Sequence, residues 1–133
     1  MYYIEELSTT KRCELVDVTA TLRLILSKAN LQNGMCYVFV PHTTAAVTIN
    51  ENADPDVCTD MIAYMDKAID NRCHYRHMEG NSPAHIKASM MGSSTAIIID
   101  DGDLVLGRWQ GVYFCEFDGP RRRKFFVKLI ADA

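Results

Sequence analysis

The chain has 133 residues, of which 48% are hydrophobic and 23% are charged, and its net charge is -3. This size and composition are typical of one globular domain, so residues 1–133 are predicted to form a single domain. The charge gives no general reason to bind nucleic acid, and no apolar run approaches the roughly 20 residues of a membrane span. Five cysteines without CxxC spacing, and an N-terminus without the features of a signal peptide, indicate a cytoplasmic protein with free thiols.

The first half of the chain alternates between strand patterns and helix patterns. Strands are predicted at 2–7, 12–18, 35–40 and 45–50. Thr19 is expected to cap a helix that ends at Asn33-Gly34. A longer helix is expected to begin at Asp54 and Pro55, because Asp is a favoured N-cap and Pro a favoured first helical residue.

The second half of the chain is richer in strands. A short helix is predicted from Ser82, as its cap, to Gly92. Strands follow at 94–100, 103–106, 108–117 and 122–131, and tight turns at Asp101-Gly102 and Asp118-Gly119 link these four as hairpins. The whole pattern predicts an α+β fold, in which a largely antiparallel sheet or sandwich packs against two or three helices.

Histidines lie at the junctions between these elements, where rigid scaffolds commonly carry binding groups. His85 is expected in the first turn of the short helix, where the helix dipole favours the neutral imidazole that a metal requires. Its eight-residue distance from His77 is not a standard zinc spacing, so an ordinary capping loop is the alternative. His42 ends a strand beside two threonines, where it can ligate a metal, bind an anion or belong to a simple turn.

Other polar residues are candidates for binding an anion. Lys87 and Arg121 can contact phosphate, and the start of the short helix favours an anion. Gln110 can point into a pocket, whereas the acidic residues around Asp54 are good helix-start chemistry. The basic run 121–124 begins a strand whose side chains alternate faces, which is typical of a solvated strand end rather than a DNA surface.

Three long blocks carry a family resemblance that covers essentially the whole chain. They are PHTTAAVTINENADPDV, HMEGNSPAHIKASMMGSS and LVLGRWQGVYFCEFDGPRRR, and they resemble the motif blocks of the YjbQ-like family, also called the secondary thiamine-phosphate synthase enzyme family. The resemblance implies an α+β fold and a homotrimer. It also implies a thiamine-phosphate synthase activity, which joins a pyrimidine-methyl diphosphate to a thiazole phosphate and releases pyrophosphate.

The resemblance also implies roles for single residues. The implied metal ligands are His42, His77 and His85, with zinc as the expected divalent metal and Mg²⁺ as the alternative for a diphosphate substrate. The implied general base or orienting carboxylate is Glu51 or Glu79. The implied substrate-binding residues are Thr43, Thr44, Asn50, Asn81, Lys87, Gln110 and Arg121. A metal-dependent hydrolase of a small molecule and a non-catalytic metabolite- or metal-binding protein are the alternative functions.

Overall fold

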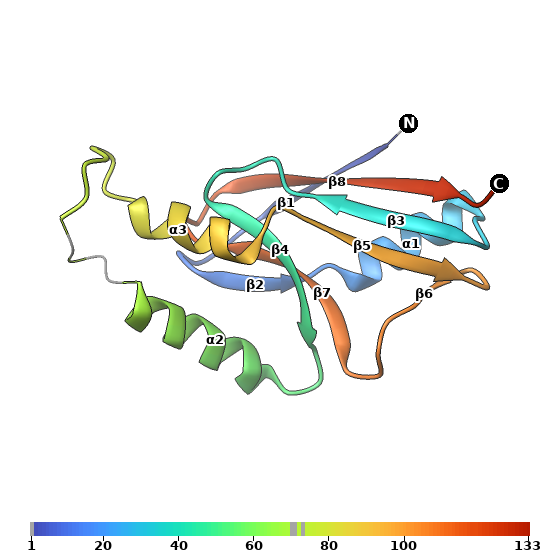
Figure 1. Ribbon diagram of the computed structural model, residues 1–133, viewed down its shortest axis with the longest axis horizontal. Coiled ribbons are helices and arrows are strands. Elements are labelled where there is room, and N and C mark those ends of the chain that lie inside the picture. Colours follow the sequence, from blue (N-terminus) through green and yellow to red (C-terminus); the bar gives the residue numbers. More distant parts are fainter. Residues whose placement is uncertain (1, 70–71, 73) are drawn as a thin grey trace.

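The computed structural model describes residues 2–69, 72 and 74–133, which form eight strands and three helices (Figure 1). The strands are β1 (Tyr3–Ser8), β2 (Glu14–Asp17), β3 (Gly34–Phe39), β4 (Ala45–Glu51), β5 (Ser94–Asp100), β6 (Asp103–Leu104), β7 (Gln110–Glu116) and β8 (Arg122–Ala131). The helices are α1 (Thr19–Ala29), α2 (Pro55–Ala68) and α3 (Ser82–Met91). No helix in these described ranges is long and apolar enough to cross a membrane.

Two antiparallel sheets form the centre of the molecule. One has five strands in the order β1-β8-β3-β5-β6, and the other has three in the order β2-β7-β4. The main core fills the space between the sheets and α1, with Leu22, Val38, Phe114 and Val127 almost fully buried. A second cluster lies on the other face of the three-stranded sheet, where α2 and α3 cover it, and α1 lies at the opposite end of the molecule from α3 (Figure 1). The predicted α+β architecture is therefore confirmed.

The links between the strands differ from the prediction. β5 and β6 form a hairpin, and Asp101 and Gly102 have positive φ angles of 49° and 77°, as the predicted tight turn requires. The expected hairpins between β6 and β7 and between β7 and β8 are wrong, because β7 lies in a different sheet from β6 and β8. β7 is the middle strand of one sheet and β8 lies between β1 and β3 in the other, so both edges of each are already paired.

Helix starts also differ in detail. Asp54 caps α2 as predicted, because its side chain accepts a hydrogen bond from the Asp56 N–H at 2.9 Å. The cap of α3 is Asn81 rather than Ser82, and its side chain makes no capping bond. Asn81 instead donates to the Asp118 carboxylate at 2.8 Å, which ties the start of α3 to the end of β7. The cap of α1 is Val18 rather than Thr19, and this helix ends at Ala29, before Asn33-Gly34.

Candidate functional site

Three loops meet at the start of α3 and enclose a hollow of about 400 Å³, which we call the histidine hollow. Its walls come from the loop between β3 and β4, the loop before α3 and the segment between β7 and β8, together with one residue each of α3 and β8. The lining residues are Pro41, His42, Thr43, Thr44, His77, Glu79, Asn81, His85, Asp118, Arg121 and Arg123. The structure thus brings together all three predicted histidines and several of the predicted substrate-binding residues, in a volume that suits a small molecule.

The three imidazoles face different surroundings within this hollow. The rings of His77 and His85 meet edge to face, with their centroids 5.2 Å apart. His42 lies against the backbone of Lys124, 3.1 Å from its nitrogen and from its oxygen. Burial and the nearby Arg123 guanidinium lower the pKa of His42 below its usual value. His42 is therefore a neutral hydrogen-bonding group at pH 7, able to donate or accept according to its tautomer.

A polar chain runs along one wall of the hollow. Arg121 donates through Nε to the Asp118 carbonyl at 2.7 Å and through Nη2 to the Asp118 carboxylate at 2.9 Å. Burial raises the pKa of Asp118, but the hydrogen bonds from Asn81 and Arg121 outweigh it and hold the pKa below its usual value. Asn81 also has a buried Oδ1 atom without a partner among the described residues. Such an acceptor costs about 1–3 kcal/mol unless a bound molecule or water supplies a donor.

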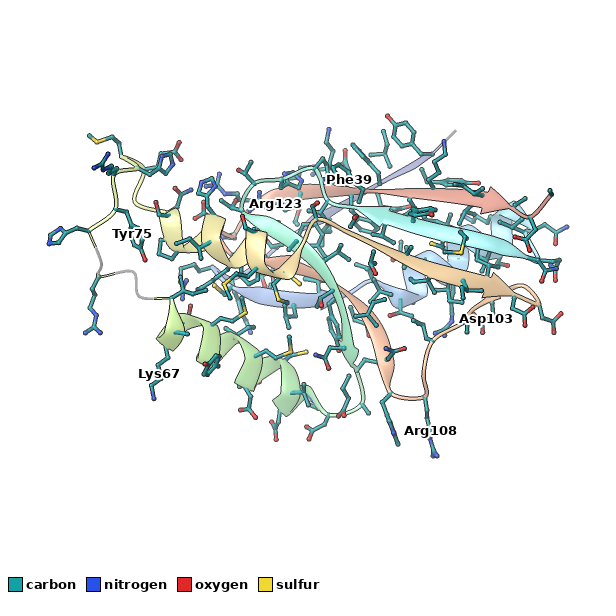
Figure 2. All side chains as sticks on the ribbon, viewed as in Figure 1. Phe39, Lys67, Tyr75, Asp103, Arg108 and Arg123 are labelled. Atoms are coloured by element: carbon teal, nitrogen blue, oxygen red, sulfur yellow. The ribbon has the colours of Figure 1, made fainter. Side chains whose placement is uncertain are left out.

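A buried ion pair lies at the histidine hollow, which one of its members, Arg123, lines. Arg123 and Glu116 have side chains only 6% and 0% exposed, and Arg123 donates to both Glu116 oxygens at 2.8 and 2.5 Å. Arg123 also donates to the Thr44 hydroxyl at 2.8 Å, between β8 and the start of β4 (Figure 2). The interpretation of the basic run as a solvated strand end is therefore wrong for Arg123. Neither member of this pair was among the predicted site residues.

Lys87 does not reach the histidine hollow. Its side chain is 2% exposed and forms an ion pair with Asp66 on α2, with the Cys13 sulfur 3.8 Å from its Nζ. Lys87 is two residues after His85, which places it about 200° around the helix from the hollow. The backbone of this first turn is also occupied, because the N–H groups of Ala84 and His85 donate to the Asn81 carbonyl. Lys87 is thus paired with Asp66 instead of lining the hollow, and two N–H groups of the helix start are already hydrogen-bonded.

The remaining predicted residues lie at the other end of β4. Asn50 and Glu51 end this strand, and Gln110 pairs with Glu51 across the sheet. A strand of this length places them about 20 Å from the hollow. Glu51 accepts from the Asp54 N–H at 3.2 Å, and Gln110 accepts from the Gly107 N–H at 2.7 Å. Of the two predicted carboxylates, Glu79 therefore lines the hollow and Glu51 lies away from it within one copy of the chain.

The histidine hollow does not contain an assembled metal site. In the described part of the chain, no three His, Cys, Asp or Glu side chains are grouped so that they could hold one ion. The side chain of His77 is 45% exposed, and its Nε2 atom lies 4.0 Å from the Glu79 carboxylate.

Comparison with known proteins gives a consistent family assignment. The family described as UPF0047 protein YjbQ-like matches residues 4–132. A UPF0047 protein of Methanocaldococcus jannaschii, MJ1081, is 49% identical over 99% of this chain and 96% of its own length. YugU of Bacillus subtilis is 46% identical over 94% of this chain and 96% of its own.

Solved structures agree with this assignment. A YjbQ/UPF0047 protein from Clostridium acetobutylicum is 52% identical and has a TM-score of 0.94, covering 96% of this chain and 99% of its own. A YbjQ-like protein from Sulfolobus solfataricus has the same TM-score at 30% identity, covering 99% and 97%. The chain therefore belongs to the YjbQ-like UPF0047 family.

Proposed function

We propose that the histidine hollow binds the phosphate group of a small phosphorylated molecule. The observation that carries this proposal is the meeting of Arg121 and three imidazoles in one hollow. An arginine has five N–H donors, and Asp118 occupies two of those of Arg121, which leaves three for a ligand. Asp118 holds the guanidinium in place, so a phosphate meets donors whose positions are already fixed.

The test is calorimetric titration of the purified protein with pyrophosphate. Arg121→Ala is expected to weaken binding about tenfold or more, since a hydrogen bond to a charged group contributes about 1.5–3 kcal/mol. Arg23→Ala is a matched control, because Arg23 is 49% exposed and pairs with Asp103 away from the hollow, as Arg121 is 50% exposed and pairs with Asp118. Equal affinities for both variants would mean that Arg121 does not contact the ligand.

The finer proposal for the reaction is transfer between a pyrimidine-methyl diphosphate and a thiazole phosphate, with release of pyrophosphate. Its support is the family resemblance and the presence of neutral His42 as a group that can move a proton. The measurement is the release of pyrophosphate when both substrates are present. We expect this release to be lost in His42→Ala. Metal-dependent hydrolysis and binding without catalysis are the other two functions, and binding without product would favour the latter.

A divalent metal, zinc, is proposed as the cofactor from the family resemblance, with His42, His77 and His85 as its ligands. The support in the structure is their common hollow, in which the side chain of His77 is half-exposed. We expect zinc affinity to fall about tenfold or more in His85→Ala, because loss of even an outer partner of a metal ligand costs this much. Zinc titration followed by elemental analysis measures it, with His74→Ala as a control outside the hollow. Unchanged zinc affinity in His85→Ala would contradict the proposed ligand set.

A homotrimer is proposed as the assembly. Its support is the outer face of the five-stranded sheet, which exposes large apolar side chains on four adjacent strands: Ile4, Tyr37, Phe39, Ile98 and Ile130. Such a patch is typical of a surface that another protein covers. Sedimentation is expected to give three chains of 15.0 kDa for the wild type and single chains for Phe39→Asp. Tyr64→Asp on exposed α2 is the control, and a wild-type monomer would exclude the trimer.

A cytoplasmic location is proposed from the cysteines. Four of them, Cys13, Cys36, Cys58 and Cys115, are free thiols, and Cys73 lies outside the described residues. Unpaired cysteines suit a reducing compartment.

A further inference from the structure

A second hollow of about 450 Å³ adjoins the histidine hollow and runs along α3. We call it the neutral hollow. His42, Thr43 and His85 line both hollows, so the two are continuous across these residues. Ser89 lines the neutral hollow one helical turn after His85, which extends the site about 6 Å along the helix.

The two hollows differ in their chemistry. Beyond the three shared residues, the neutral hollow is lined by Ala45, Ala88, Ser89, Gly92 and Ser93, none of which is ionisable. Ala45 and Ala88 form a buried floor, only 1% and 7% exposed. The histidine hollow, by contrast, is lined by two arginines and two carboxylates in addition to its imidazoles.

Apart from the two imidazoles that it shares with the histidine hollow, the neutral hollow offers hydroxyl groups and no ionisable side chain. The side chains of Ser89 and Ser93 are exposed and make no hydrogen bond to any described residue. Each hydroxyl can both donate and accept, so together they match hydroxyl or amide groups of a ligand. A carboxylate or ammonium group placed there would lose hydration without gaining an opposite charge, which disfavours a charged ligand body.

We infer that the ligand is a phosphate monoester with a small, uncharged body that carries hydroxyl or amide groups. This inference rests on the proposed phosphate site: the phosphate lies in the histidine hollow, and the body passes His85 into the neutral hollow. The substrate class therefore excludes phosphate esters whose bodies carry a carboxylate near the phosphate.

Three probes test the inference by calorimetry on the full chain: inorganic phosphate, glycerol 3-phosphate and 3-phosphoglycerate. The last two differ mainly by a carboxylate in the body. Glycerol 3-phosphate is expected to bind about tenfold more tightly than either of the others, since an unpaired buried charge and lost body contacts each cost on the order of one tenfold step. Equal affinities for glycerol 3-phosphate and 3-phosphoglycerate would overturn the inference that the ligand body is uncharged.

Substitutions at Ser89 distinguish binding of the ligand body from binding of its phosphate group. Ser89→Phe, which fills the neutral hollow, is expected to weaken glycerol 3-phosphate about tenfold and to leave inorganic phosphate within about twofold. Ser89→Ala keeps the space and is expected to cost only a few-fold, the contribution of one neutral hydrogen bond. An ester that binds Ser89→Phe as it binds the wild type would overturn the inference while phosphate binding stands. Failure of the wild type to bind any of the three probes would overturn the proposed function as well.

Discussion

Replacing Glu116 by Ala is expected to lower the free energy of unfolding by about 3–5 kcal/mol. The guanidinium of Arg123 is 6% exposed, and Glu116 neutralises it with two hydrogen bonds. Without the carboxylate, a charge would remain buried with the Thr44 hydroxyl and carbonyl as its polar partners. Urea denaturation followed by circular dichroism measures the loss.

Glu6→Ala provides the matched control. Glu6 also pairs with an arginine of β8, but its partner Arg122 is 75% exposed and Glu6 itself is 56% exposed. Removing a solvated pair of this kind costs about 0–1 kcal/mol. If Glu116→Ala and Glu6→Ala unfold at the same urea concentration, the buried pair does not stabilise the fold.

A double variant distinguishes an unpaired charge from general loss of packing. Glu116→Leu combined with Arg123→Met removes both charges and keeps apolar volume, so it is expected to recover much of the stability lost in Glu116→Ala. Recovery would not restore the loop geometry, because Arg123 also holds Thr44, and Glu116 accepts from the Asp118 N–H at 3.0 Å. Weakened phosphate binding in a stable double variant is therefore expected.

The sequence predicted the helices and strands better than it predicted which strands pair with one another. Asp54 and Pro55 begin α2 as expected, because a helix start depends on neighbouring residues. The separation of β7 and β8 into two sheets was missed, because strand pairing is decided by contacts between distant segments. The same limit applies to β1 and β2, which also follow one another in the chain and lie in different sheets.

The residues of the candidate site were likewise predicted only in part. His42, His77 and His85 were predicted from their places at element junctions, and these junctions do meet at one end of the fold. Glu116 and Arg123 were missed, although a glutamate between Cys115 and Phe117 in an apolar strand is a usable signal. A carboxylate in such a strand needs a buried partner of opposite charge. The basic residues nearest in the sequence lie in the following strand, where successive side chains point to opposite faces.

The ion pair between Lys87 and Asp66 gives the second large effect. Asp66→Asn is expected to lower the free energy of unfolding by about 3 kcal/mol, because the 2% exposed ammonium of Lys87 would lose its charged partner. Lys87→Met is the matched control: it removes the buried charge and leaves Asp66 partly exposed beside Arg12, so it is expected to cost about 1 kcal/mol. Thermal unfolding at pH 7 compares the two, and equal losses would show that the buried ammonium finds other partners.

The same pair predicts how acid acts on the contact between α2 and α3. Burial raises the pKa of Asp66, but hydrogen bonds from Lys87 and Arg12 outweigh it and hold the pKa below the usual 3.8. A carboxyl group with a lowered pKa in the folded state contributes stability above its unfolded pKa and loses it as the pH falls through the folded value. Wild type should therefore lose stability below about pH 4 relative to pH 7, and Asp66→Asn should lose less over the same range. Because this ion pair joins α2 to α3, its loss should weaken the contact between the two helices. Parallel pH profiles for wild type and Asp66→Asn would contradict this contribution of the pair.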